Sequence, residues 1–312
     1  MKIATARMAA GLVAGKYLHQ LKRLARRPPK RIDFVVLDID HTLIHETSAY
    51  AALEKMLGPK RAREEYEAQK KLVKAGAKSF EDVKLWGHNL QMAEGWTRHH
   101  WRALADVLFR NLHDPGVIRG IVEAKKANPE LRVVLTSGTS GDFASKIAQI
   151  LHHDYGLVVD KVIGSEQKYG PRGEVVGLDH FIGDKNRSRP PTISKVSALR
   201  KNVPGFDLRR TLAISDADPS LLRKAGVGLL LPVPKSRDPM SFISQKLGLF
   251  DVKSRYGAIH GDVVRELLLD PRRAVVESRT RVPLEHGGFS DALTKRVIRE
   301  RLEARRSRSH GF

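Results

Sequence analysis

Short apolar runs alternate with helix-like segments along this chain, and that alternation is the feature that most constrains its fold. Strand patterns cover 34–37, 132–136, 158–163 and 211–214, and segments with helical spacing of apolar residues lie between them, including 117–126 and 142–152. Strands that alternate with helices pack as a mostly parallel sheet covered by helices on both faces. The sequence therefore predicts a doubly wound parallel α/β fold.

A long helical segment interrupts this alternation after the first strand pattern. Residues 48–112 are helical in pattern and contain a single proline, Pro59. The stretch GAKSFEDVKLW (76–86) predicts a turn followed by a new helix, with Ser79 as its N-cap. Asp114-Pro115-Gly116 breaks the chain before the alternation resumes. We expect a helical insertion over residues 45–112, within a core formed by 32–44 and 113–249.

Positive charge is concentrated at the two ends of the chain. The net charge is +21, of which residues 1–31 carry +9 and residues 250–312 carry +5. Residues 7–26 predict a basic amphipathic helix that Pro28-Pro29 ends, and a second helix is expected over about 291–306. The first helix fits three interpretations: a helix that packs on its own protein or on lipid, an organelle presequence if the source is eukaryotic, or a secretory signal.

Composition excludes some classes of protein and favours others. There is no cysteine, which excludes disulfides, thiolate metal sites and a cysteine nucleophile. No segment is predominantly apolar over the roughly 20 residues that a membrane span needs, so we expect no transmembrane segment and a cytoplasmic location. The basic balance favours polyanionic partners: phosphorylated small molecules, nucleic acid, or an anionic membrane surface contacted from one side.

Acidic and hydroxyl side chains follow three of the strand patterns. Asp38 and Asp40 follow the first, Thr136-Ser137-Gly138 the second, and the segment with Asp216 and Asp218 a later one. In an open α/β sheet the carboxyl ends of the strands form the binding crevice. Four carboxylates in one crevice repel each other, and a divalent cation would relieve that repulsion. Oxygen ligands beside an anionic substrate suit Mg²⁺.

Four segments in this order resemble the motifs of the haloacid dehalogenase (HAD) superfamily. DIDHTL (38–43) resembles the first motif, VVLTSGTS (133–140) the second, SKVSALR (194–200) the third and AISDADPSLLRKAG (213–226) the fourth. The resemblance spans about residues 32–235 and is to the phosphoserine-phosphatase-like branch. It implies a Rossmann-like core with a helical cap, 45–112, inserted after the first strand. The charge distribution adds basic extensions at both ends of this core, 1–31 and 250–312.

The resemblance also implies a role for each matching residue. Asp38 would be the nucleophile that forms an aspartyl-phosphate, and Asp40 the general acid and base. Phosphate-binding groups would be Thr42, Thr136, Ser137, Gly138 and Lys195, and the Mg²⁺ ligands would come from Asp38, Asp40, Asp216 and Asp218. The implied activity is that of a Mg²⁺-dependent phosphomonoesterase acting on an unidentified phosphorylated substrate.

Several assignments have alternatives. Lys185 could replace Lys195 as the catalytic lysine, although Lys195 has the spacing expected before Asp216. Thr136 could replace Ser137 as the phosphate-contacting hydroxyl, because a slip of one residue in a strand reverses its side chains. Asp218 follows Asp216 more closely than the branch usually has it, so it could bind metal or only cap the helix that begins at Pro219.

Substrate specificity stays open at the level of sequence. The cap glutamate of phosphoserine phosphatase falls on Thr47 here, its cap arginine has no counterpart, and Glu46 and Lys84 are candidate substitutes. A second functional class also fits the composition: a catalytically weak protein of the same fold whose basic extensions hold nucleic acid or anionic membrane. Hydrolysis of a generic aryl phosphate would separate the two classes.

Overall fold

The computed structural model describes residues 27–110, 115–183, 185–231, 252–253 and 261–275. The helices expected over 7–26 and 291–306 lie outside these residues. Among the described helices, none is long and apolar enough to cross a membrane.

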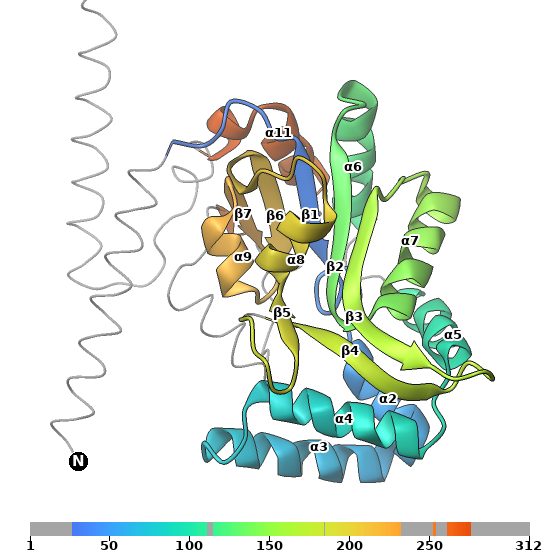
Figure 1. Ribbon diagram of the computed structural model, residues 1–312. Helices are drawn as coiled ribbons and strands as arrows, with labels where there is room; N and C mark the ends of the chain where they lie inside the picture. The colour runs from blue at the N-terminus through green and yellow to red at the C-terminus, as the bar shows by residue number, and fades with distance from the viewer. Residues whose placement is uncertain (1–26, 111–114, 184, 232–251, 254–260, 276–312) are drawn as a thin grey trace, which may run out of the picture. The chain divides into compact units, whose positions relative to one another are not determined.

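Eight described strands form one sheet in the order β5-β4-β3-β2-β1-β6-β7-β8 (Figure 1). Their bounds are β1 Phe34–Asp38, β2 Arg132–Ser140, β3 Lys161–Tyr169, β4 Val175–Gly183, β5 Thr192–Ser194, β6 Thr211–Ser215, β7 Val227–Leu230 and β8 Val252–Lys253. The central strand β1 pairs in parallel with β2 on one side and with β6 on the other. The doubly wound α/β fold predicted from the sequence is confirmed.

The sheet differs from an all-parallel one at β4, which the sequence did not predict. β3 and β4 pair antiparallel, and only residues 170–174 connect them. A parallel return needs a crossover of a dozen or more residues, so a connection this short enforces an antiparallel hairpin. Gly173 has φ 79° in that turn, a conformation that glycine adopts without a steric penalty.

Each face of the sheet is covered by its own hydrophobic cluster. Val35 and Leu37 of β1 belong to one cluster, and Phe34 and Val36 belong to the other. Successive side chains of a strand point to opposite faces, so a central strand buried on both sides must be apolar at every position. The helices α6 (Pro115–Ala127), α7 (Gly141–Tyr155) and α11 (Gly261–Leu269) contribute to the first cluster, and α8 (Lys195–Asn202) and α9 (Pro219–Lys224) to the second.

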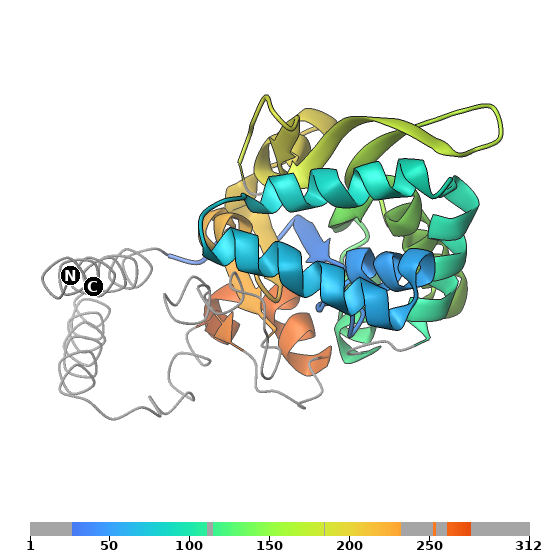
Figure 2. The same cartoon turned by 90° about the horizontal axis from the view of Figure 1, so that it is seen from below.

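The helical insertion consists of α2 (Ser48–Leu57), α3 (Pro59–Lys74), α4 (Phe80–Ala93) and α5 (Arg98–Phe109). Figure 2 shows α3 and α4 running across the sheet at the carboxyl end of β1. Ser79 caps α4 as predicted, because its side chain accepts a hydrogen bond from the Asp82 amide and its own amide donates one to Asp82 Oδ2.

Backbone hydrogen bonds join the insertion to the β3–β4 hairpin. The amide of Val175 donates to the Trp96 carbonyl at 2.7 Å, and the amide of Arg98 donates to the Gly173 carbonyl at 3.0 Å. The insertion is thus anchored at the start of α5, beside the hairpin.

The segment 261–275 packs with the core. Val264, Leu267 and Leu268 of α11 are buried in the same cluster as β1. Gly120 lets α11 approach α6 closely, since a β-carbon there would lie 2.3 Å from the Gly261 carbonyl oxygen. The expected C-terminal extension, 250–312, therefore includes a portion that is integrated into the core. The chain divides into two compact units, and the first of them ends at Val275.

Candidate active site

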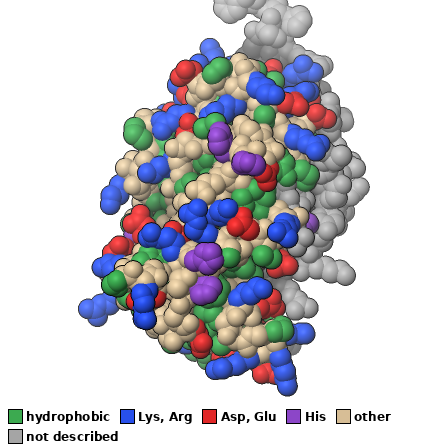
Figure 3. All heavy atoms as spheres, turned by 90° about the vertical axis from the view of Figure 1, so that its right-hand side faces the viewer, with side chains coloured by type: hydrophobic (Ala, Val, Ile, Leu, Met, Phe, Trp, Pro, Cys, Tyr) green, Lys and Arg blue, Asp and Glu red, His purple; other side chains and the backbone are tan. Residues whose placement is uncertain are grey.

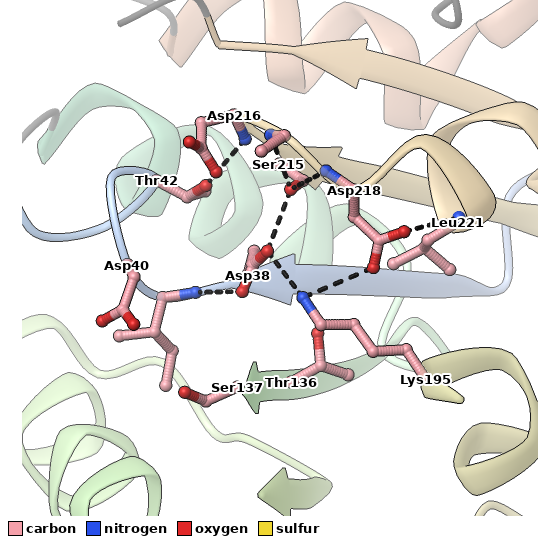
Figure 4. A network of polar contacts seen from close by, with 12 residues as sticks. Asp38, Asp40, Thr42, Thr136, Ser137, Lys195, Ser215, Asp216, Asp218 and Leu221 are labelled. Carbon is pink, nitrogen blue, oxygen red and sulfur yellow. Dashed lines mark hydrogen bonds and ion pairs between the residues drawn. The ribbon is translucent and has the colours of Figure 1, made fainter. Parts of the chain in front are cut away.

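Asp38, the last residue of β1, lies at the centre of a polar network at the carboxyl end of the sheet (Figure 4). Lys195 Nζ is 2.6 Å from Asp38 Oδ2, and the hydroxyl of Ser215 donates to the same oxygen at 2.9 Å. The amide of Ile39 donates to Asp38 Oδ1 at 3.0 Å. Asp38 and Lys195 are both more than nine-tenths buried, so the carboxylate is held in one orientation by a desolvated ammonium and two neutral donors.

Lys195 reaches Asp38 because it begins α8. Ser194 caps that helix by accepting a hydrogen bond from the Ser197 amide at 3.2 Å, which starts the helix at Lys195. The other lysine considered from the sequence, Lys185, is exposed on the loop between β4 and β5. Of the two lysines, the structure brings Lys195 to Asp38.

Asp218 both caps a helix and contacts the lysine. Its Oδ1 accepts a hydrogen bond from the Leu221 amide at 2.9 Å, which is the N-cap contact of α9. Its Oδ2 accepts no hydrogen bond from the described residues but lies 3.4 Å from Lys195 Nζ. The carboxylates of Asp38 and Asp218 therefore share one ammonium.

The loop after β6 is tied to the loop after β1. Ser215 Oγ accepts hydrogen bonds from the amides of Ala217 and Asp218, and the Asp216 amide donates to Thr42 Oγ1 at 3.0 Å. Thr42 and Asp216 are both buried. Thr42, expected among the phosphate-binding groups, here joins the first and fourth motifs.

Asp40 is held by Ser48, the first residue of α2. The amide and the hydroxyl of Ser48 donate to the two carboxylate oxygens of Asp40, each at 3.0 Å, and Thr139 Oγ1 lies 3.2 Å from Oδ2. Burial raises the pKa of Asp40 above its ordinary value, and the hydrogen bonds from Ser48 act in the opposite direction. Directly after Asp40 the chain turns sharply, and His41 adopts φ 55°.

The hydroxyl residues of the second motif point in different directions. Thr136 lies opposite Asp38 in the β1–β2 register, and its hydroxyl donates to the Leu37 carbonyl at 3.2 Å. Ser137 Oγ accepts a hydrogen bond from the Thr139 amide at 3.0 Å, so its own proton can be donated to another acceptor. Both residues are fully buried.

Three contributors to the site were not predicted: Ser215, Ser48 and Thr139. Ser215 directly precedes Asp216 at the end of a strand, and this position in the sequence could have indicated that it belongs to the site. Ser48 and Thr139 carried no signal, because they are 8 and 99 residues from Asp40 in the sequence. Their contacts depend on how the insertion and β2 meet the first loop.

The carboxylate oxygens at this edge of the sheet are the kind of ligand that a hard divalent cation binds. Asp38 and Asp216 are buried carboxylates at the ends of the neighbouring strands β1 and β6. Among the residues that the structure describes, no three His, Asp or Glu side chains converge as a ligand set. A magnesium ion here would complete its coordination with backbone oxygen and water, which Mg²⁺ usually retains.

Known proteins share this architecture. A family model described as haloacid dehalogenase-like hydrolase matches residues 35–218. A HAD family hydrolase of Salmonella enterica subsp. enterica serovar Typhi is 17% identical, with a TM-score of 0.50 and with 69% of this chain and 68% of that chain covered. A protein of unknown function from Bordetella pertussis Tohama I is 18% identical, with a TM-score of 0.50 and coverage of 70% and 96%.

Phosphoserine phosphatase, solved as an analogue of its phospho-aspartyl intermediate, is 17% identical over 70% of this chain and 91% of that one, with a TM-score of 0.47. No curated protein matches the chain. The family match covers more than half of the sequence and includes the strand ends that carry Asp38, Asp216 and Asp218. The chain belongs to the haloacid dehalogenase-like hydrolase family.

Proposed function

We propose that this protein is a Mg²⁺-dependent phosphomonoester hydrolase that works through an aspartyl-phosphate on Asp38. The observation that carries the proposal is the position of Asp38, whose Oδ2 contacts Lys195 at 2.6 Å and Ser215 at 2.9 Å. A carboxylate fixed in this way is oriented for attack, and its ammonium partner can neutralise charge on an incoming phosphoryl group.

The reaction has two steps. In the first, a carboxylate oxygen of Asp38 attacks phosphorus and the bond to the leaving oxygen breaks, while Asp40 gives that oxygen a proton. In the second, water attacks the same phosphorus, Asp40 takes a proton from the water, and the bond between phosphorus and the Asp38 oxygen breaks, which gives inorganic phosphate and the free Asp38 carboxylate. The raised pKa of Asp40 favours the protonated form that the first step needs.

Other residues bind and orient the phosphoryl group. The Ser137 hydroxyl and the Gly138 amide would donate to its oxygens, and Lys195 would balance its charge together with that of Asp38. Asp38, Asp216 and the backbone carbonyl of Asp40 would hold the magnesium ion, with Asp218 in contact with Lys195. When bound, the ion supplies Lewis-acid stabilisation of the phosphoryl oxygens.

The cap, α2–α5, would exclude water from the reacting group. Its first residue, Ser48, contacts Asp40 directly, so a movement of the cap would also move the donors that hold the general acid. The substrate we expect is a phosphorylated small molecule that enters between the cap and the strand ends.

Phosphate release from p-nitrophenyl phosphate tests the proposal. We expect turnover with Mg²⁺, loss of turnover in EDTA, and recovery when Mg²⁺ is restored. Asp38→Asn should lower kcat by at least about a thousandfold, because the nucleophile itself is removed. Hydrolysis that Asp38→Asn leaves unchanged would show that the nucleophile is assigned wrongly.

The phosphate-release assay, combined with a salt titration of nucleic-acid binding, separates a binding protein from an enzyme. A protein that only binds nucleic acid would give tight, steeply salt-dependent binding without phosphate release. On the face shown in Figure 3, basic side chains are interspersed with acidic and histidine side chains. Two ion pairs join α5 and α7: Arg98 with Asp142 at 3.1 Å and Lys146 with Asp106 at 3.0 Å. The terminal extensions lie mostly outside the described residues.

A further inference from the structure

The strands β3, β2, β1, β6 and β7 all begin at one end of the sheet, opposite the active site (Figure 1). Phe34, the first residue of β1, pairs with Arg132 of β2 on one side and with Thr211 of β6 on the other. Backbone hydrogen bonds also join the segments that enter these strands: the Arg132 amide donates to the Asp33 carbonyl at 2.9 Å, and the Asp33 amide to the Arg210 carbonyl at 2.8 Å. These segments therefore form one continuous surface. We call it the amino end of the sheet, and it consists of residues 27–33, 125–132, 160–161, 200–210 and 223–226.

Positive charge is concentrated at the amino end. Its residues include thirteen Lys/Arg and four Asp/Glu, and eleven of the thirteen basic side chains are exposed. The cap and its lead-in, 45–110, hold twelve Lys/Arg against nine Asp/Glu, and the segment 261–275 holds three of each. The excess of positive charge is therefore a property of the amino end and not of the whole surface.

Stabilisation of helix ends accounts for only part of this charge. Six of the basic residues lie in the last turns of α6, α8 and α9, where a cation interacts favourably with the helix dipole. The other seven lie outside the α-helices: Arg27, Lys30, Arg31, Arg132, Lys161, Arg209 and Arg210. Asp33 contacts two of these seven, Arg31 at 2.7 Å and Arg210 at 2.5 Å. More than half of the cations are thus not explained by the helices that end here.

The basic segment 1–26 is attached to the chain at this same end. Arg27, which follows it directly, lines a shallow hollow together with Arg209 and Arg210. Residues 1–26 hold six Lys/Arg and no acidic residue. The amphipathic helix predicted over 7–26 has these apolar residues at spacings of three to five: Met8, Leu12, Tyr17, Leu21 and Leu24. The amino end and this segment therefore bring basic and apolar side chains to one side of the protein.

This combination favours a lipid surface over a nucleic acid. The interface of a bilayer accepts the apolar side chains of an amphipathic helix, and anionic headgroups attract the lysines and arginines beside them. Nucleic-acid phosphates attract the same cations but have no use for an apolar helix face. One weak membrane signal gives marginal, reversible binding, whereas two signals together give stable anchoring.

We propose that the amino end is a docking surface for an anionic lipid bilayer, with the attached segment 1–26 as a second membrane-binding signal. A strand rises about 3.3 Å per residue, so Asp38 lies about 13 Å beyond Phe34, on the side away from the bilayer. The active site therefore stays open to solvent in the docked protein. The proposal does not depend on the proposed phosphatase activity.

Vesicle flotation with the full-length protein tests the proposal. The probes are large unilamellar vesicles of phosphatidylcholine alone and of phosphatidylcholine with about 30% phosphatidylserine. We expect the partition coefficient to be at least about tenfold higher on the anionic vesicles at physiological ionic strength, and the difference to disappear in about 1 M salt. Equal partition on both kinds of vesicle, or no binding to either, would overturn the proposal.

Two variants with the same net charge assign the binding to the amino end. Each Lys or Arg near an anionic surface contributes about fivefold to binding, so neutralising four exposed residues there should lower the partition coefficient at least about tenfold. The amino-end variant carries Lys126→Gln, Lys161→Gln, Lys201→Gln and Arg209→Gln. The control variant neutralises four exposed residues of the cap and should bind within about threefold of wild type: Lys55→Gln, Lys60→Gln, Lys71→Gln and Arg61→Gln. Equal losses in both variants would show that only the overall charge matters, which contradicts the proposal.

A duplex of about 20 base pairs, followed by fluorescence anisotropy at the same salt concentration, tests the other polyanion. Tight duplex binding that the amino-end variant loses, without a preference for anionic vesicles, would identify a nucleic-acid surface and contradict the proposal. If the amino-end variant does not fold, as judged by circular dichroism, the pair Lys201→Gln with Arg209→Gln is compared with the pair Lys55→Gln with Arg61→Gln. The first pair should then weaken binding to anionic vesicles at least about fivefold more than the second, and an equal effect contradicts the proposal.

Discussion

Replacing Lys195 by Met should destabilise the protein strongly, because two buried carboxylates depend on its ammonium. Nζ lies 2.6 Å from Asp38 Oδ2 and 3.4 Å from Asp218 Oδ2, and the Lys195 side chain is 8% exposed. Removing one partner of a buried ion pair costs about 3–5 kcal/mol, since the remaining charge stays buried. The free energy of unfolding, measured in urea without Mg²⁺, should fall by that amount.

A double-mutant cycle separates this interaction from loss of packing. Asp38→Asn in the Lys195→Met background removes the charge left without its partner, so the double variant should be less destabilised than the sum of the single variants by about 1–3 kcal/mol. The exposed pair Lys146–Asp106, with side chains 25% and 48% exposed, is the control, and its cycle should give less than about 1 kcal/mol. Additive effects at Lys195 and Asp38 would refute the reasoning.

Three further changes test the fold. Burial lowers the pKa of His88, because the charged imidazolium is disfavoured in the interior. The stability that the buried neutral His88 contributes should therefore be fully present above a pH of about 6.5 and be lost as the pH falls below that value. In urea unfolding, His88→Leu should remove this part of the pH dependence. Gly120→Ala should cost about 1–3 kcal/mol, because its β-carbon would lie 2.3 Å from the Gly261 carbonyl oxygen, whereas Gly87→Ala, with nothing within 4 Å, should gain up to about 1 kcal/mol in thermal unfolding. Ser79→Ala should cost about 1 kcal/mol in the same assay, since α4 loses its capping box.

Much of the fold follows from local patterns in the sequence. The apolar run of β1, the helical spacing after it and the cap at Ser79 act over a few residues, so they are readable without knowing the fold. Parallel strands bring their carboxyl ends to one edge, which is why the positions of Asp38, Thr136 and Asp216 could be predicted together. The hairpin at β4 was missed because no strand was predicted over Val175–Gly183, so the short connection that makes it antiparallel to β3 was not recognised.

Details of the site were decided by tertiary structure. Lys195, Ser215 and Lys84 contact partners that are 157, 177 and 98 residues away in the sequence. Sequence spacing favoured Lys195 over Lys185, but its contact with Asp38 depends on where α8 begins relative to β1. No local preference of the chain encodes which hydroxyl faces a given carboxylate.

The sequence by itself determined the alternation of strands and helices, the helical insertion and the strand ends at which acidic residues gather, because periodicity and capping are short-range properties. Only the folded chain decided that Ser215 would orient Asp38, that Ser48 would hold Asp40 and that Lys84 would lie beside Gly138. Those contacts arise when helices and strands pack, and packing depends on the shapes of surfaces that distant parts of the chain form together.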